Sequence, residues 1–262
     1  MELGFVETRV TIANTIVSQQ CFLESIGYMK NPFRNIVMLF KRHFLGGVVT
    51  LDGVKIDTKL IQSSTVRNLL FKGIYEDDER KLLSVICDER DVILEIGAGI
   101  GAIGLIAAKL CNKGAVYSYE ANTKMAPVIA RNYELNSHVP TLHLKPITTD
   151  GLPINFSVTD NIISSSSYSR SDVDGLMNTL ESLSITEAME THAPNFVIMD
   201  VEGYEADLLL IPFGKEVTKL LIEFHPHIIG SDAVADLKTR LDEQGFHEMA
   251  ASGNNVAFLR AV

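Results

Sequence analysis

The feature that most constrains the fold of this chain is the glycine-rich stretch from Val92 to Gly104, VILEIGAGIGAIG. An apolar segment typical of a buried strand precedes the glycines, and an apolar helix-forming segment follows them. Because glycines have no side chains, a ligand can approach the backbone and the N-terminus of the following helix. The stretch therefore predicts a strand, a ligand-binding turn and a helix, as in a nucleotide-binding α/β unit.

Strand and helix patterns alternate from Glu76 to the C-terminal end of the chain. Alternation of this kind predicts a mostly parallel sheet with helices on both faces, with a ligand at the carboxyl ends of the strands. Helices are expected at residues 76–87, 102–110, 124–136, 186–191, from 203 onward and at 231–245. Strands are expected at residues 92–96, 115–119, 141–147, 153–158, 196–200, 219–224 and 255–260.

Residues 1–72 lack this alternation and are interpreted as an N-terminal accessory region of helices and a hairpin, ahead of a main domain at residues 73–262. Residues 48–57 alternate around Asp52-Gly53, which predicts the hairpin. Pro32–Phe44 reads as a short basic amphipathic helix, more typical of a packed surface helix than of one that contacts a membrane. Asn161–Asp174, with its run of serines, is expected to be a loop.

Composition limits the partners of the chain. A formal charge of -10 opposes extended contact with nucleic acid, which depends on neutralising phosphates. No apolar run approaches the roughly 20 residues of a membrane span, and the N-terminus lacks a secretory signal, so a cytoplasmic protein without stable membrane insertion is expected. The widely spaced Cys21, Cys87 and Cys111 argue against a zinc site and a disulfide framework.

The glycines alone fit two different cofactors. Gly99 to Gly104 satisfies the dinucleotide fingerprint G-x-G-x-x-G, and Glu120 ends the next strand at the distance expected for a ribose-binding acid. An NAD-dependent oxidoreductase is therefore a legitimate alternative. Glu95, two residues before the first glycine, is expected at the mouth of the turn, where its charge would repel a pyrophosphate and attract the cationic S-adenosyl-L-methionine. This charge argument favours the methyl donor.

Several separate motifs of the chain resemble those of the FkbM-type methyltransferases. They are Tyr75-Glu76, Glu95 to Gly101, Tyr119 to Asn122, Asp200 to Glu205 (DVEGYE) and Ile222 to Pro226. The resemblance spans about residues 71–224, and DVEGYE is its most specific element. The chain departs from the family at the first turn, where D-x-G-A-N-x-G is common and this chain has Glu95 and Gly99.

The resemblance implies a Rossmann-like class I methyltransferase fold with a seven-stranded sheet. It also implies methyl transfer from S-adenosyl-L-methionine, usually to a hydroxyl oxygen, often on a sugar or a secondary metabolite. A small-molecule or glycan substrate is therefore expected, with a homo-oligomer left open. The candidate cofactor-binding residues are Tyr75, Glu95, Gly97, Ala98, Gly99, Gly101, Glu120, Ala121, Thr148 and Asp200.

Acidic residues gather after two of the expected strands. Asp200 ends one strand, Glu202 and Glu205 enter the following helix, and Glu223 and His225 end the neighbouring strand. His225, Asp200 and Glu202 are the candidate catalytic residues, because removing a proton from a hydroxyl needs a base. Two alternatives remain open: transfer driven by positioning alone, and acids placed in a first helical turn only because the helix dipole favours them there.

A metal site formed by Asp200, Glu202, Glu223 and His225 is chemically conceivable, since carboxylates and imidazole bind divalent ions. Spacing along the sequence gives it little support, and no metal is included in the sequence-based prediction. A methyltransferase fold that serves only as an interaction module is a further alternative, disfavoured because a scaffold has no need of these acids.

Overall fold

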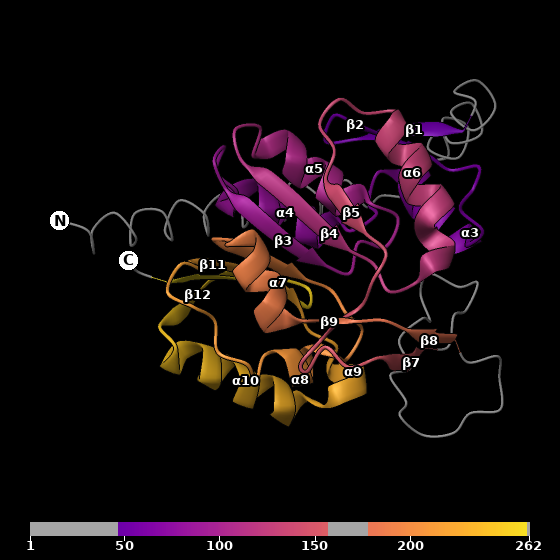
Figure 1. Cartoon of the computed structure of the whole chain (residues 1–262). Coiled ribbons are helices and arrows are strands. Elements are labelled where there is room, and N and C mark those ends of the chain that lie inside the picture. Colours follow the sequence, from indigo (N-terminus) through magenta and orange to yellow (C-terminus); the bar gives the residue numbers. More distant parts are fainter. Residues whose placement is uncertain (1–46, 157–177, 261–262) are drawn as a thin grey trace.

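The computed structural model describes residues 47–156 and 178–260 of the chain (Figure 1). The expected basic helix at Pro32–Phe44, the serine-containing loop at Asn161–Asp174 and Cys21 lie outside these described residues.

A seven-stranded sheet forms the centre of the described structure, in the order β12-β13-β11-β10-β3-β4-β5. The strands are β3 (Val92–Ile96), β4 (Ala115–Tyr119), β5 (Thr141–His143), β10 (Phe196–Met199), β11 (Lys219–Glu223), β12 (Phe246–Ser252) and β13 (Asn255–Arg260). Strands β5, β4, β3, β10 and β11 are parallel, whereas β13 pairs antiparallel with both β11 and β12. The expected seven-stranded, mostly parallel sheet is thereby confirmed.

Helices cover both faces of this sheet (Figure 1). One face carries α3 (Ser64–Lys72), α4 (Asp77–Ile86), α5 (Ala102–Leu110) and α6 (Ala126–Glu134), the last preceded by a 3-10 turn at Thr123–Met125. The other face carries α7 (Ile185–His192), α8 (Glu205–Leu208), α9 (Pro226–Ile229) and α10 (Ser231–Glu243). Within the described ranges, no helix has the length and apolar character needed to cross a bilayer.

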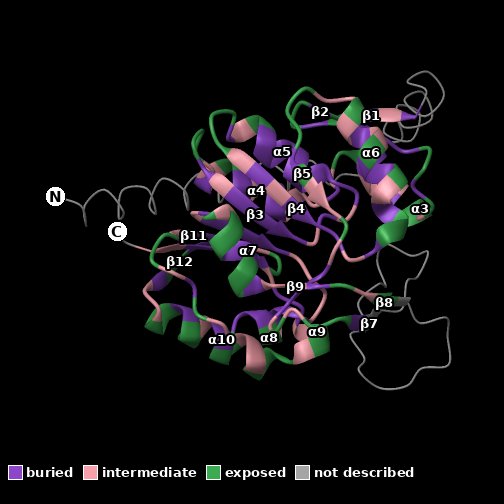
Figure 2. Cartoon of the chain, in the orientation of Figure 1, coloured by how far each residue is buried: buried purple, intermediate pink, exposed green. Residues whose placement is uncertain are grey.

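Strand β10 shows why the sheet is buried on both sides. Phe196 and Ile198 belong to the hydrophobic core on the α4 and α5 side, while Val197 and Met199 belong to the core on the α7 and α10 side. All four side chains are buried, as expected for a parallel strand covered by helices on both faces. Figure 2 shows buried residues along the neighbouring strand β3 as well. The packing of β10 fixes the position of Asp200, which follows β10 directly.

The predicted hairpin is confirmed as β1 (Val48–Leu51) and β2 (Val54–Asp57), which pair antiparallel around Asp52-Gly53. Its buried Ile56 joins the core of α4 and α5. The Asp57 backbone N–H donates a 2.9 Å hydrogen bond to the Asn132 side chain of α6. The described part of the expected accessory region thus packs into the main core, and the division at residue 72 stays a prediction.

Some elements differ from the sequence-based expectation. The strand expected at 141–147 is instead β5 and a separate two-residue β6 (Ile147–Thr148), which pairs with β9 (Leu183–Ser184). The expected short strand at 153–158 is β7 (Ile154–Phe156), paired with β8 (Asn178–Leu180). Helix α3 and strand β12 were not expected. The sequence of β12, FHEMAAS, has weak strand propensity, and antiparallel pairing with β13 stabilises it.

Replacing Ile56 by alanine tests whether the hairpin belongs to the main core. The Ile56 side chain is fully buried, so Ile56→Ala is expected to lower the free energy of unfolding by about 2 to 5 kcal/mol. Urea unfolding should remain one cooperative transition when followed by circular dichroism. The exposed Lys55→Ala variant is the control; an Ile56→Ala effect no larger than that of the control would contradict a shared core.

Candidate active site

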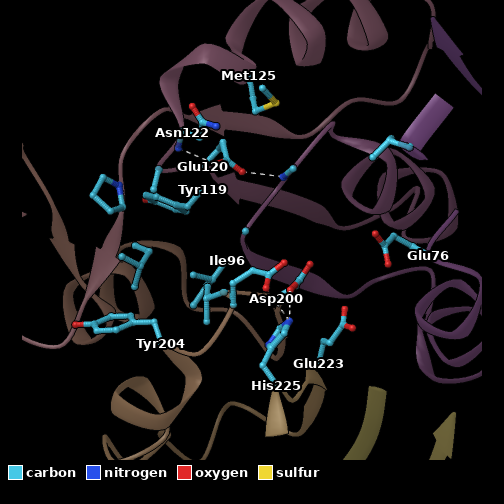
Figure 3. Close-up of a pocket in the computed structure, with 18 of the residues that line it drawn as sticks. Glu76, Ile96, Tyr119, Glu120, Asn122, Met125, Asp200, Tyr204, Glu223 and His225 are labelled. Carbon is cyan, nitrogen blue, oxygen red and sulfur yellow. Dashed lines mark hydrogen bonds and ion pairs between the residues drawn. The ribbon is translucent and has the colours of Figure 1, made fainter. Parts of the chain in front are cut away.

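A cavity of about 330 Å³ lies at the carboxyl ends of β3, β4, β10 and β11 (Figure 3), the edge where the parallel sheet was expected to bind a ligand. Its lining residues come from the glycine turn, from the loops after these strands, from α3 and from the segment before α4. They are Val66, Leu69, Tyr75, Glu76, Ile96, Gly97, Gly99, Tyr119, Glu120, Ala121, Asn122, Met125, Pro146, Ile147, Asp200, Val201, Glu202, Tyr204, Glu223 and His225.

The glycine turn is held between the ends of β10 and β4, the two strands that flank β3. Its Gly97 has a positive φ of 98°, and a Cβ atom at this position would lie only 1.8 Å from the carbonyl oxygen of Asp200. On the other side, the Gly97 and Ala98 N–H groups donate hydrogen bonds of 2.9 and 3.1 Å to the Tyr119 carbonyl. Glycine is thus required at residue 97 by both conformation and close approach.

Glu120 caps the glycine turn from the end of β4. One carboxylate oxygen accepts a 2.7 Å hydrogen bond from the Gly99 N–H, and the other accepts a 2.6 Å bond from the Asn122 N–H. The carboxyl is buried, and burial raises its pKa to about 7 although these backbone donors act in the opposite direction. Glu120 therefore lines the cavity with its carboxylate already oriented.

Glu95 does not occupy the expected position at the mouth of the turn. Its side chain is buried, accepts a hydrogen bond from the Ser118 hydroxyl, and is absent from the cavity lining. A Cβ atom on Gly104 would lie 2.4 Å from a Glu95 oxygen, so the carboxylate packs against α5. The reason is strand alternation: Ile96 faces the other side of the sheet from Glu95. Burial raises the pKa of Glu95 to about 7.

The other predicted cofactor-binding residues divide into two groups. Tyr75, Gly97, Gly99, Glu120, Ala121 and Asp200 line the cavity. Ala98, Gly101 and Thr148 are buried outside the lining. Gly101 stands at the start of α5, where a Cβ atom would press on Tyr133 and Ile129. The Thr148 hydroxyl lies 3.0 Å from that of Ser182.

All three predicted catalytic residues meet at one side of the cavity, where Figure 3 labels Asp200 and His225. The Nε2 atom of His225 lies 3.6 Å from Oδ1 of Asp200 and 3.5 Å from Oε2 of Glu202. Glu223 joins them, since one donor atom each from Asp200, Glu223 and His225 lie within 4.8 Å of one another. The carboxyl ends of β10 and β11 thus combine residues that are separated in the sequence.

Glu205, the last acid of the DVEGYE motif, orients His225. Its buried Oε1 accepts a 2.8 Å hydrogen bond from the His225 backbone N–H and lies 3.3 Å from Nδ1 of the ring. Burial lowers the pKa of His225, but the hydrogen bond to Glu205 and the charges of Asp200, Glu205 and Glu202 outweigh it and raise the pKa to about 9. Such an imidazole holds a proton at neutral pH, which favours a carboxylate over His225 as the catalytic base.

Negative charge is concentrated on this side of the cavity. Burial raises the pKa of Asp200 well above its usual value, and the nearby Glu223 and Glu76 raise it further. Burial, together with Glu223, also raises the pKa of Glu76 to about 7. Mutual repulsion and burial of these acids make the site favourable for a cation.

Two of these acids also have an unusual backbone. Glu76 and Glu202 line the cavity with φ angles of 45° and 46°, in the left-handed region that costs about 1 kcal/mol or more for a residue other than glycine. Strain of this kind is retained where the surrounding structure fixes the conformation. Glu76 and Glu202 therefore place their carboxylates at the cavity although glycine would adopt this backbone conformation at lower cost.

Several lining residues were not among the predicted site residues, among them Val66, Leu69, Asn122 and Met125. Val66 and Leu69 belong to α3, inside the region interpreted as accessory. A signal for this helix was present: Ser63 caps its N-terminus, Gly73 ends it in a left-handed conformation, and apolar residues recur at helical spacing. Nothing in the sequence alone indicated that the helix reaches the site.

A family model described as the methyltransferase FkbM domain matches residues 95–248. This match covers more than half of the 262-residue chain. The chain belongs to the FkbM methyltransferase family. The resemblance to FkbM-type methyltransferases that the sequence motifs indicated is thereby confirmed. Nothing in the match supports the alternative of an oxidoreductase.

Solved structures similar to this FkbM methyltransferase are distant in sequence. The FkbM methyltransferase from Methylobacillus flagellatus KT is 14% identical over 74% of this chain and 52% of its own, with a TM-score of 0.43. Precorrin-6y C5,15-methyltransferase from Geobacter metallireducens GS-15 is 14% identical over 78% of this chain and 91% of its own, with a TM-score of 0.42. No curated protein matches the sequence.

The buried Glu95 generates a prediction about pH and stability. Because its pKa rises from 4.5 in the unfolded chain to about 7 in the folded one, its stabilising contribution is complete below pH 4.5 and is lost as pH rises through 7. Relative to Glu95→Gln, the wild-type protein is expected to lose about 2 kcal/mol of unfolding free energy between pH 5.5 and 8.

Urea unfolding of both proteins at the two pH values measures this difference. The exposed Glu243→Gln variant on α10 is the matched control for replacing a carboxylate with an amide. A Glu95→Gln difference that stays constant with pH would show that Glu95 is not desolvated in the folded protein.

Proposed function

We propose that this FkbM-family protein transfers a methyl group from S-adenosyl-L-methionine to a hydroxyl oxygen of a small molecule or glycan. The observation that carries the proposal is the group of carboxylates from Asp200, Glu202 and Glu223 beside the glycine turn. S-adenosyl-L-methionine is cationic at its sulfonium and amino groups, and negative charge in a partly buried cavity favours such a ligand.

The proposed cofactor position follows from the turn and from Glu120. The backbone of Gly97 and Gly99 lines the cavity, so a ligand can contact the turn without side chains in between. Glu120 presents a preoriented carboxylate suited to accept hydrogen bonds from ribose hydroxyls. A dinucleotide fits this cavity less well, because its pyrophosphate would meet the acids of β10 and β11.

The proposed methyl transfer is a single displacement step. The acceptor oxygen attacks the methyl carbon, the carbon–sulfur bond breaks with its electrons left on sulfur, and the hydroxyl proton passes to a base. Glu202 is the proposed base, because its side chain is 32% exposed at the cavity and lies close to His225. The main requirement is to hold the acceptor in line with the methyl group.

Isothermal titration tests the cofactor. The wild-type protein is expected to bind S-adenosylhomocysteine, and Glu120→Ala to bind it about 10- to 100-fold more weakly, since hydrogen bonds to a charged group are worth about 1.5 to 3 kcal/mol. Glu190→Ala, an exposed acid on α7, is the matched control and should bind like the wild type.

Titration with NADH under the same conditions should give no binding heat. If folded wild-type protein binds no S-adenosylhomocysteine, or binds NADH instead, the proposal is wrong. A thermal melt of each variant separates loss of binding from loss of folding, because Glu120 also holds the glycine turn.

A separate assay tests the acceptor. Incubation with a labelled methyl donor and a panel of hydroxylated metabolites and glycans is expected to yield O-methylated product, identified by mass spectrometry. Glu202→Gln should slow transfer far more than it weakens S-adenosylhomocysteine binding, because Glu202 acts on the acceptor and S-adenosylhomocysteine lacks the sulfonium charge that this carboxylate attracts. Methylation found only at nitrogen or carbon atoms would contradict the O-methyl assignment while leaving the cofactor in place.

A further inference from the structure

The feature of interest is the arrangement of Asp200, Glu223 and His225, whose side chains point toward one another at the ends of β10 and β11 (Figure 3). We propose that these three residues bind a divalent cation, which in turn holds the acceptor oxygen beside the methyl donor. The role of the ion rests on the function proposed above, but its binding can be measured independently.

The spacing of the donor atoms fits one ion. Nε2 of His225 lies 3.6 Å from Oδ1 of Asp200, and the three donor atoms are all within 4.8 Å of one another. Two ligands about 2.1 Å from an ion, at angles between 90° and 120°, are about 3.0 to 3.6 Å apart. Small side-chain adjustments would therefore bring all three residues onto a common cation.

His225 is prepared for this role by its surroundings. Only 6% of its side chain is exposed, and Glu205 lies 3.3 Å from Nδ1, which directs Nε2 into the cluster. At 3.5 and 3.6 Å from the nearest carboxylate oxygens, Nε2 is farther from them than in an ordinary hydrogen bond. A carboxylate that orients the far nitrogen of an imidazole is the usual support of a metal-binding histidine.

Asp200 supplies a second, independent observation. Its Oδ1 atom is buried and has no hydrogen-bond partner. As a whole the Asp200 side chain is 30% exposed, but this oxygen is shielded from solvent. A shielded carboxylate oxygen without a hydrogen-bond partner is costly, and an ion would satisfy it. The main chain of Asp200 is held in place, because its carbonyl packs against Gly97 and its N–H donates a 2.9 Å hydrogen bond to the Ile96 carbonyl.

The charge balance also favours a cation. Glu76 and Glu202 lie at the same side of the cavity as the cluster, and the described residues that line the cavity include no lysine or arginine to balance these acids. Two carboxylates and one imidazole are a mixed set of hard and intermediate ligands, which suits Mn²⁺ and related divalent ions better than a thiolate-preferring metal. Metal binding displaces the proton from the ring.

The prediction made from the sequence did not include a metal. Along the chain, 22 positions separate Asp200 from Glu223, and this spacing matches no standard metal-binding motif. Only the parallel pairing of β10 with β11 brings the two strand ends together. The inferred ion would coordinate the acceptor hydroxyl and so supply the in-line positioning that methyl transfer requires.

Electron paramagnetic resonance of Mn²⁺ provides the test. Wild-type protein saturated with S-adenosylhomocysteine is expected to bind one Mn²⁺ per chain, seen as loss of the signal of the free ion. Pulsed measurements should detect coupling of the bound ion to an imidazole nitrogen, and His225→Gln should abolish that coupling. Affinity should fall at least about tenfold in His225→Gln and Glu223→Gln. It should fall about 10- to 100-fold in Glu205→Gln, which removes the charge beside the ring and one of the two oxygens that accept backbone hydrogen bonds from Gly203 and His225.

The matched control is Asp207→Asn, an exposed acid on the same short helix as Glu205, which should leave Mn²⁺ affinity unchanged. S-adenosylhomocysteine binding by each variant reports that the fold and cofactor site are intact. Absence of Mn²⁺ binding in wild-type protein that binds S-adenosylhomocysteine would overturn the metal proposal alone. Equal Mn²⁺ affinity in the wild type and in His225→Gln would also overturn it, because the ion would then be bound elsewhere.

Discussion

The close contact between Gly97 and the carbonyl of Asp200 is the constraint on which the site depends. A side chain at residue 97 would overlap that carbonyl, so the glycine turn and the end of β10 can meet only because residue 97 has none. On the other side, the turn donates two backbone hydrogen bonds to the Tyr119 carbonyl. A ligand-binding backbone is thereby placed directly beside the first acid of the DVEGYE motif.

The acids around the site fall into two groups: some accept hydrogen bonds from backbone N–H groups, and others lie buried close to further carboxylates. Glu120 is held by backbone N–H groups, and Glu205 by the backbone N–H groups of Gly203 and His225. Asp200 and Glu76, in contrast, have raised pKa values because burial and their neighbours disfavour the ionised forms. A site built in this way stores unfavourable electrostatic energy that a cationic ligand relieves. The cofactor proposal draws on this property, and the metal proposal rests on the geometry of Asp200, Glu223 and His225.

Much of the fold could be predicted because the spacing of apolar residues along the sequence indicates which side of a strand or helix is buried. β3, α5, β4 and β13 have the bounds expected from the sequence, since each is either uniformly apolar or closely bounded by turn residues. Strand β12 could not be predicted in the same way, because its sequence has weak strand propensity and it becomes a strand by pairing with β13. Family membership followed from motifs that keep fixed local spacing, and the family match confirms it.

The sequence by itself determined the glycine turn, most of the order of strands and helices, the family and the acids that gather after β10 and β11. Only the tertiary structure decided which of these residues face the cavity. The Glu95 side chain packs against α5, on the side of the sheet where strand alternation places it. Helix α3, from the expected accessory region, contributes residues to the cavity wall. The tertiary structure also set Asp200, Glu223 and His225 within reach of one ion. The physical reason is that parallel pairing brings the ends of neighbouring strands together whatever their separation in the sequence. A local sequence pattern contains no information about which strands pair.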